Sequence, residues 1–210
     1  MKPRAASTQR RTRIQKENER IILESALEIF STNGFRGSTI DEIATAAGMS
    51  KPNLLYYFRR KEDMHQALLD QLLANWLAPL EEMDPDGEPI EEICNYLRRK
   101  LQMAQEYPRE SRLFANEILQ GAPHIKKQLE GALRNLVDEK SILIENWISQ
   151  GKLVACDPRH LLFSIWATTQ HYADFDVQIC AILAEDERIN MRFEDAAKML
   201  EQLYVDGLKI

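Results

Sequence analysis

The chain has 210 residues, of which 44% are hydrophobic and 29% are charged, and its formal net charge is −6. Its apolar stretches are too short to cross a bilayer, and no apolar segment follows the basic N-terminal residues, so we expect neither a membrane span nor a secretory signal. Three widely spaced cysteines, Cys94, Cys156 and Cys180, lack C-x-x-C spacing. This favours structural thiols in a reducing cytoplasm over a metal site or disulfides.

The charge is unevenly distributed along the sequence. Residues 1–61 contain 12 Lys and Arg against 6 Asp and Glu, a net charge of +6, whereas residues 62–210 contain 15 against 27, a net charge of −12. A basic N-terminal part and an acidic remainder indicate that only the N-terminal part contacts phosphate groups. The alternative is a basic tail that serves solubility, because residues 1–20 alone supply 7 of the 12 positive charges.

The N-terminal quarter predicts a disordered basic arm over residues 1–14, followed by three helices. The first runs over 15–32 and ends at Gly34 through a left-handed cap. Thr39 opens a short second helix that ends at Ala47. After a turn, Ser50 caps a third helix, which carries Pro52 in its first turn, where proline is tolerated.

The remainder also has apolar residues at spacings of three and four, which predicts an all-α protein of about nine helices. We expect a fourth helix from Lys61 to a break at Pro79, and further helices over 88–106, 108–120, 123–150, 157–184 and 190–205. The resulting domains are a helix-turn-helix domain over 15–62 and a helical ligand-binding and dimerisation domain over 63–210.

The second and third helices have the features of a DNA-binding helix-turn-helix. The residues that join them, 47–49, include the small residue and the glycine that two steeply crossing helices require. Leu54 and Phe58 face inward from the third helix, which leaves its N-terminal residues to reach base edges in the major groove. Lys51 suits guanine acceptors and Asn53 suits adenine or phosphate.

Residues 22–68 resemble the DNA-binding domain of the TetR family of bacterial transcription regulators. The matching positions are Ile22, Leu23, Ala26, Leu27, Phe30, Gly34, Gly37, Thr39, Ile43, Ala44, Ala47, Gly48, Met49, Ser50, Leu54, Phe58, Lys61 and Glu62. Together with the helix-turn-helix pattern, the resemblance implies a DNA surface made of Thr39, Ser50, Lys51, Pro52, Asn53, Tyr56, Tyr57 and Lys61.

Two positions depart from the family pattern. Leu55 stands where an aromatic residue is usual, and Tyr57 where a histidine is frequent, so Tyr56 is expected to take over a phosphate contact. For the two tyrosines, packing between helices is the alternative. Lys61 is either a phosphate ligand or a solvated charge at an unfavourable helix start. Arg4, Arg10, Arg11 and Arg13 either enter the minor groove or serve solubility.

The C-terminal part resembles a narrower group within the family, the uracil-sensing regulators of pyrimidine utilisation. The similar segments are residues 54–58, 76–80, 107–108, 111–114, 121–123, 138–141, 151–153 and 165–175. The resemblance implies uracil or a related pyrimidine as the effector. A different small planar or hydrophobic effector is the alternative.

The residues themselves suggest where such a ligand binds. Gln170 shares a helix face with Trp166, and its amide presents a donor beside an acceptor, which complements the imide edge of uracil. The expected walls are Trp76, Phe114 and Trp166. Further polar candidates are Tyr107, Glu117, Tyr172 and Asp174. The alternatives are that the tryptophans belong to the core, that Gln170, His171 and Asp174 hydrogen-bond at a dimer interface, and that Glu117 pairs with Arg112.

The family resemblance implies a homodimer in which the last two helices form a four-helix bundle with the partner. The expected contacts are Leu161, Ile165, Thr168, Tyr172, Phe193, Ala197, Leu200 and Tyr204. Two recognition helices on one dimer suit a palindromic duplex. The family default is repression.

An enzyme and a helical adaptor protein are the competing classes. The four histidines lack metal-ligand spacing, and neither a nucleophile elbow nor a phosphate-binding loop is present. His171 and Asp174 form an i,i+3 pair, but an interface pair explains them better than a catalytic dyad. We therefore expect no catalytic residues, no metal and no cofactor.

Overall fold

The computed structural model describes residues 5–183 and 189–210, and every regular element in these ranges is helical. The chain divides into two compact units, Met1–Leu72 and Leu73–Ile210. The division lies inside the fourth helix, ten residues beyond the boundary expected at residue 62. Among the described residues, no helix has the length and apolar character that a membrane span needs.

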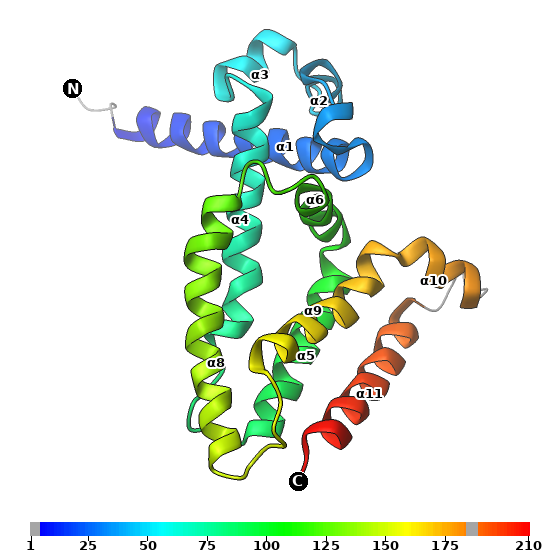
Figure 1. Ribbon diagram of the computed structural model, residues 1–210. Helices are drawn as coiled ribbons and strands as arrows, with labels where there is room; N and C mark the ends of the chain where they lie inside the picture. The colour runs from blue at the N-terminus through cyan, green and yellow to red at the C-terminus, as the bar shows by residue number, and fades with distance from the viewer. Residues whose placement is uncertain (1–4, 184–188) are drawn as a thin grey trace. The chain divides into compact units, whose positions relative to one another are not determined.

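The first unit contains α1 (Ala5–Gly37), α2 (Ile40–Ala46), α3 (Lys51–Tyr57) and the first half of α4 (Lys61–Glu81). Figure 1 shows α2 and α3 together on one side of α1. The core is built from residues that are fully inaccessible to solvent, among them Ile22, Phe30, Ile43, Leu54 and Met64. Apolar residues at spacings of three and four on these helices therefore pack into one hydrophobic core.

Helix α1 begins at Ala5, whereas residues 1–14 were expected to form a disordered arm. Alanine, glutamine and arginine dominate residues 5–13, and these are good helix formers. Adding turns to an existing helix avoids a second costly nucleation step. The regular helix is interrupted at Gly34, whose φ of +68° and ψ of 169° are non-helical, near the expected end of the first helix. Residues 1–4, with Arg4, lie outside the described residues.

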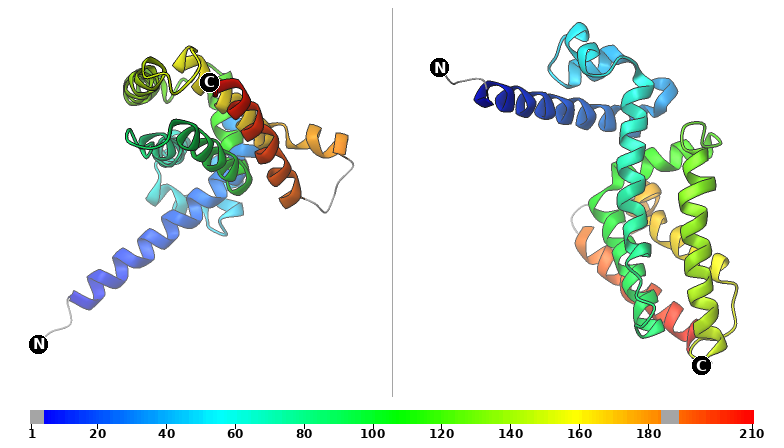
Figure 2. Two further views of the ribbon diagram at one scale, coloured as in Figure 1. Left: turned by 90° about the horizontal axis from the view of Figure 1, so that it is seen from below. Right: turned by 90° about the vertical axis from the view of Figure 1, so that its left-hand side faces the viewer.

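The second unit contains the rest of α4 and a longer series of helices. These are α5 (Pro89–Glu106), α6 (Pro108–Leu119), α7 (Lys126–Gln128), the π-helical turn η1 (Leu129–Leu133), α8 (Arg134–Ser149), α9 (Pro158–Asp174), α10 (Asp176–Leu183) and α11 (Ile189–Leu208). Figures 1 and 2 show α9 crossing α5, with α11 alongside them.

Three expectations about these helices are corrected. Helix α4 continues to Glu81, so Pro79 lies in its last turn and does not end it. The helix expected over 123–150 begins at Lys126 and contains the π-helical turn η1. The helix expected over 157–184 breaks at Phe175 into α9 and α10. These breaks raise the number of helical segments in the described residues above the nine expected.

A buried lysine fixes the end of α4. The Nζ atom of Lys140 in α8 donates to the backbone oxygens of Glu81 and Met83, at 3.1 and 3.3 Å. Carbonyls at the C-terminus of a helix lack partners within the helix, and a cation satisfies them well. This contact anchors the half of α4 that belongs to the second unit.

Candidate DNA-binding surface and effector pocket

The turn between α2 and α3 is built by local hydrogen bonds. Thr39 caps α2 reciprocally with Glu42: the Glu42 N–H donates to Thr39 Oγ1 at 3.2 Å, and the Thr39 N–H donates to Glu42 Oε2 at 2.8 Å. Gly48 has a φ of +65°, which favours glycine, and the Met49 N–H donates to the Ala44 oxygen at 2.9 Å. This tight turn sets the direction in which α3 leaves.

Helix α3 has one buried and one exposed side. Leu54 is fully buried and Phe58 partly buried, whereas the residues at the start of the helix are exposed. Tyr56 is 72% exposed, and its ring meets the Tyr57 ring edge-on at 5.2 Å between centroids. The exposed candidate DNA contacts are Thr39, Ser50, Lys51, Pro52, Asn53 and Tyr56.

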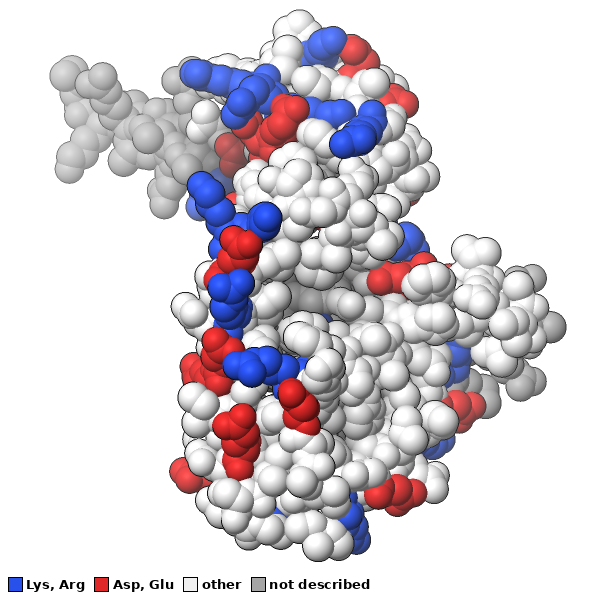
Figure 3. Space-filling model, viewed as in Figure 1, with Lys and Arg blue, Asp and Glu red and all other residues white. Residues whose placement is uncertain are grey.

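Basic side chains surround this exposed side. Arg36, Lys51, Arg59 and Arg60 are all exposed in the first unit, as is Arg13 on α1. Figure 3 shows Lys and Arg on the visible face of this unit, with Asp and Glu side chains beside them. Basic side chains around an exposed recognition helix provide the electrostatic attraction that DNA binding requires.

Lys61, one of the expected DNA contacts, has partners within its own unit. Its Nζ atom donates to the backbone oxygens of Phe35 and Ser38, both at 2.7 Å, and lies 4.3 Å from the centre of the Phe35 ring. An ammonium group at a helix N-terminus is unfavourable by itself, and here it is stabilised by one carbonyl near the end of α1 and one just after it. Lys61 therefore holds the start of α4 against the end of α1 through these hydrogen bonds.

Two other candidates make contacts within the unit but keep donor capacity. Lys51 Nζ lies 2.8 Å from Asp41 Oδ2 in an exposed ion pair. Tyr57 Oη accepts from Asn18 Nδ2 at 2.6 Å, which leaves the phenolic proton free to donate. Asn18 thus positions Tyr57 from α1, a contact that no local pattern indicates.

The second unit contains a cavity of about 310 Å³. Leucines from α4 and η1 provide much of its wall, and four of the residues expected to bind ligand line it together: Trp76, Phe114, Trp166 and Gln170. These residues come from three different helices, so only the folded unit brings them to one place. Aromatic walls with few polar groups are typical of small-molecule sites.

The polar groups of the cavity lie on α5 and α9. The Trp166 indole N–H donates to Tyr96 Oη at 2.6 Å, and burial raises the pKa of Tyr96. Lys100 also lines the cavity, and burial lowers the pKa of this lysine to about 7. Neither Tyr96 nor Lys100 was expected in the site. Lys100 follows Arg98 and Arg99, a run typical of a solvated face.

The remaining ligand candidates lie elsewhere. Tyr107 is 43% exposed between α5 and α6. Glu117 is buried, where its carboxylate accepts from the His124 backbone N–H at 2.6 Å and lies 3.0 Å from His124 Nδ1. Tyr172 packs against Phe193, with ring centroids 6.0 Å apart. The residues that line the cavity do not include these three.

Asp174 lines a second, more open groove that shares Phe114 and Gln170 with the cavity. Its carboxylate accepts from Ser111 Oγ at 2.6 Å. Burial raises the pKa of this carboxyl group. Asp174 therefore borders the site and fastens the end of α9 to the start of α6.

Most residues expected at a dimer interface are buried within the chain itself. Leu161, Ile165, Phe193, Leu200 and Tyr204 belong to the core of the second unit. Thr168 is half-buried, with its Oγ1 3.3 Å from the Tyr204 hydroxyl oxygen, and Ala197 packs against the same core.

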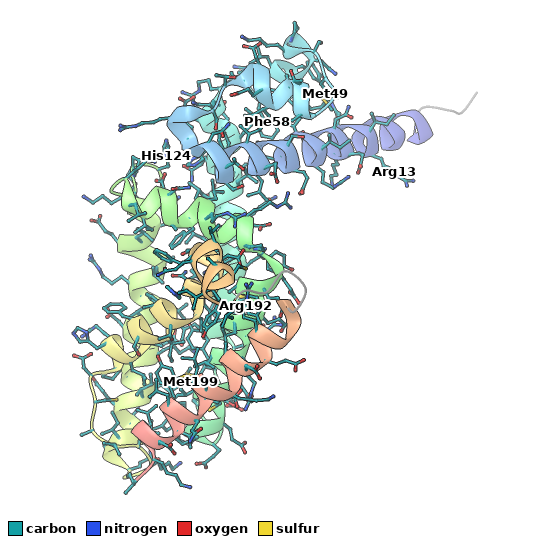
Figure 4. All side chains as sticks on the ribbon, turned by 90° about the vertical axis from the view of Figure 1, so that its right-hand side faces the viewer. Arg13, Met49, Phe58, His124, Arg192 and Met199 are labelled. Atoms are coloured by element: carbon teal, nitrogen blue, oxygen red, sulfur yellow. The ribbon has the colours of Figure 1, made fainter. Side chains whose placement is uncertain are left out.

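Helices α9 and α11 are apolar on two sides, and a single sequence pattern does not distinguish the inner side from the outer. Their exposed apolar residues are Phe163, Met199 and Leu203, with Phe175 just after α9. Figure 4 labels Met199 and Arg192 along α11. The Arg192 guanidinium donates a hydrogen bond from Nη2 to Asp176 Oδ1 of α10 at 2.6 Å.

The short α3 after its glycine turn and the separate helical unit with an apolar cavity define a helix-turn-helix transcription regulator with a ligand-binding domain. Residues 22–68 match the family described as bacterial regulatory proteins, tetR family, and residues 69–210 match the C-terminal region of YcdC-like proteins. The chain belongs to the TetR family.

Relatives support this assignment along the whole chain. The chain is 43% identical to the HTH-type transcriptional regulator RutR of Escherichia coli strain K12, over 97% of this chain and 96% of that protein. It is 22% identical to the uncharacterized HTH-type transcriptional regulator YhgD of Bacillus subtilis, over 70% of this chain and 78% of that protein. These relatives are named as transcription regulators, not enzymes.

Solved structures show the same fold at low identity. AibR in complex with isovaleryl coenzyme A and operator DNA has a TM-score of 0.69 and 18% identity, covering 89% of this chain and 97% of that one. A TetR-like transcriptional regulator from Rhodococcus sp. RHA1 has a TM-score of 0.66 and 22% identity, covering 90% and 94%.

Proposed function

We propose that this regulator is a homodimeric repressor, acting on palindromic operator DNA in the bacterial cytoplasm, whose affinity for that DNA is controlled by uracil or a related pyrimidine. The observation that carries the proposal is the cavity that Gln170 lines together with the aromatic rings of Trp76, Phe114 and Trp166. The resemblance of this part of the sequence to uracil-sensing regulators supports the same effector.

The chemistry of the cavity suits a small planar imide. Its volume of about 310 Å³ is at the lower end of ligand sites, which favours a single ring over a long acyl chain. Aromatic walls provide stacking surfaces, and the Gln170 amide supplies one donor and one acceptor for an imide edge. The alternative effector is another small planar or hydrophobic molecule.

Helix α4 offers a route from ligand to DNA. Its first half contributes Met64 and Leu68 to the core of the DNA-binding unit, and its second half contributes Trp76 and Leu80 to the cavity wall. A ligand that displaces Trp76 shifts α4 and with it the recognition helix. Half-sites lie one helical turn of DNA apart, so a small change in spacing disrupts simultaneous contact.

Operator affinity measured with and without uracil tests the proposal. A palindromic duplex selected from random sequences is titrated by fluorescence anisotropy. Uracil is expected to weaken wild-type binding by roughly 5- to 150-fold, the usual range of allosteric coupling. Gln170→Leu should bind the same duplex but lose the response. Equal affinity with every pyrimidine tested would contradict the effector assignment.

The proposed dimer packs through the outward sides of α9 and α11. Met199→Glu is expected to dissociate it, because the twofold axis places two uncompensated charges in one interface, each costing about 3–5 kcal/mol. Ile142→Glu on α8 is the matched control, since Met199 and Ile142 are both 60% exposed. Sedimentation velocity distinguishes the species. A monomeric wild type, or a Met199→Glu protein that stays dimeric, contradicts this interface.

A further inference from the structure

Lys100 lines the cavity and has no polar partner among the described residues. Its residue is only 4% exposed, and among the described residues Nζ makes no hydrogen bond or ion pair; its recorded contact is the Trp76 ring, 4.9 Å from the ring centre. The Trp76 indole N–H is buried without a hydrogen-bond partner in the described part of the chain. Burying donors without acceptors costs free energy.

A second buried lysine, Lys140, has a purely structural role. Lys140 is 6% exposed, but its Nζ atom donates to two backbone oxygens and lies 3.2 Å from Glu139 Oε1. Lys100 has none of these acceptors. The contrast separates a lysine that holds the fold together from one whose donors remain available inside a ligand-sized cavity.

Lys100 and Gln170 occupy matching positions on neighbouring helices. One turn earlier, Tyr96 of α5 and Trp166 of α9 are joined by their hydrogen bond of 2.6 Å. Beyond the end of α5, Ser111 bonds to Asp174 at the end of α9, so the two helices run in the same sense. Lys100 lies four residues after Tyr96, and Gln170 lies four residues after Trp166. Both Lys100 and Gln170 line the cavity.

We propose that Lys100 binds the effector directly, its ammonium group donating to a carbonyl or anionic oxygen of a planar cyclic imide whose imide edge is held by Gln170. This inference rests on the proposed pyrimidine effector, and it adds a residue that determines which pyrimidines the cavity binds. The Gln170 amide can rotate to offer either a donor or an acceptor at a given place. An ammonium group only donates, so Lys100 selects a ring oxygen over an exocyclic amine.

Binding by Lys100 also makes effector affinity depend on pH. Burial lowers the pKa of Lys100 to about 7, so part of the free protein carries an uncharged amine near neutrality. The residues that line the cavity from α4, α6, η1 and α9 are uncharged, and the other titratable lining residue is Tyr96 of α5, whose pKa is raised by burial. A ligand oxygen favours the charged form, so binding takes up a proton.

Calorimetric titration of the full-length protein with uracil and cytosine tests the proposal. Uracil is titrated between about pH 6.5 and 8.5 in buffers of different ionisation enthalpy. Wild-type binding is expected to take up a proton and to weaken by up to about tenfold per pH unit above pH 7. Lys100→Met should bind uracil at least about tenfold more weakly at pH 6.5, lose the pH dependence and discriminate less against cytosine.

Arg99→Met is the matched control, because Arg99 is an exposed neighbour on the same helix and its replacement makes the same change in net charge. It should bind uracil as the wild type does, and melting temperatures verify that both variants fold. If Lys100→Met keeps wild-type affinity and pH profile, the role of Lys100 is overturned while the pyrimidine effector stands. If the wild type binds no pyrimidine, both proposals are overturned.

Discussion

Lys51→Ala is expected to lower the affinity for operator DNA by roughly 30-fold to 10⁴-fold. Lys51 is exposed at the N-terminus of α3, where a recognition helix meets base edges. A good contact between a side chain and a base contributes about 1–3 kcal/mol, and a dimer on a palindrome makes the contact twice. Fluorescence anisotropy at one fixed salt concentration, with a specific and a random duplex, measures the effect.

Asp41 provides the control for this prediction. Its ion pair with Lys51 is exposed, so breaking it costs the free protein at most about 1 kcal/mol. Asp41→Asn releases the Lys51 ammonium group and removes a negative charge beside it, so operator binding should tighten a few-fold. If Lys51→Ala weakens the specific and random duplexes equally, Lys51 contacts phosphate and the base-reading role is wrong.

Local chemistry made much of the DNA-binding unit predictable. Thr39 as a cap, Gly48 in the turn and Leu54 on the inner face of α3 each follow from residues no more than a few positions away. The roles of Lys61 and Tyr57 do not. The acceptors of Lys61 lie 23 and 26 residues earlier, and the donor to Tyr57 lies 39 residues earlier. Partners at such separations are set by tertiary packing.

The same distinction applies to the cavity. Trp76, Phe114, Trp166 and Gln170 were expected there because rings and an amide suit a planar ligand, and the structure brings them together. The sequence does not single out Lys100, because it follows Arg98 and Arg99 in a charged run typical of a solvated face. The position of Lys100 around the helix nevertheless indicates that it is buried.

Lys100 follows Ile93 and Leu97 at spacings of seven and three, on the buried face of α5. For a charged residue, the phase of the helix is a better guide to burial than the character of the adjacent residues. The residues expected at the dimer interface show a related difficulty. Helices α9 and α11 are apolar on two sides, and periodicity identified the side that faces the protomer's own core.

Lys100→Met is also expected to stabilise the protein, by on the order of 3–5 kcal/mol at or below pH 7. Burial lowers the pKa of Lys100 from 10.5 to about 7, and each unit corresponds to about 1.4 kcal/mol. Below pH 7 the folded protein must keep a buried charge, so the full cost is present. Between pH 7 and 10.5 the unfolded state binds more protons than the folded state, so wild-type stability rises with pH.

Urea unfolding followed by circular dichroism, from about pH 6.5 to 9.5, measures this difference. The advantage of Lys100→Met should be largest at pH 6.5 and shrink toward pH 9.5, whereas Arg99→Met should show no such trend. The upper limit avoids ionisation of Tyr96 in the unfolded state, which would lower stability because burial raises the pKa of Tyr96 in the folded protein. A constant difference across this range, or a less stable Lys100→Met protein, would show that the ammonium group has a stabilising partner of its own. A stability gain accompanied by weaker uracil binding would show that the fold retains a costly charge because the ligand requires it, as is usual where function opposes stability.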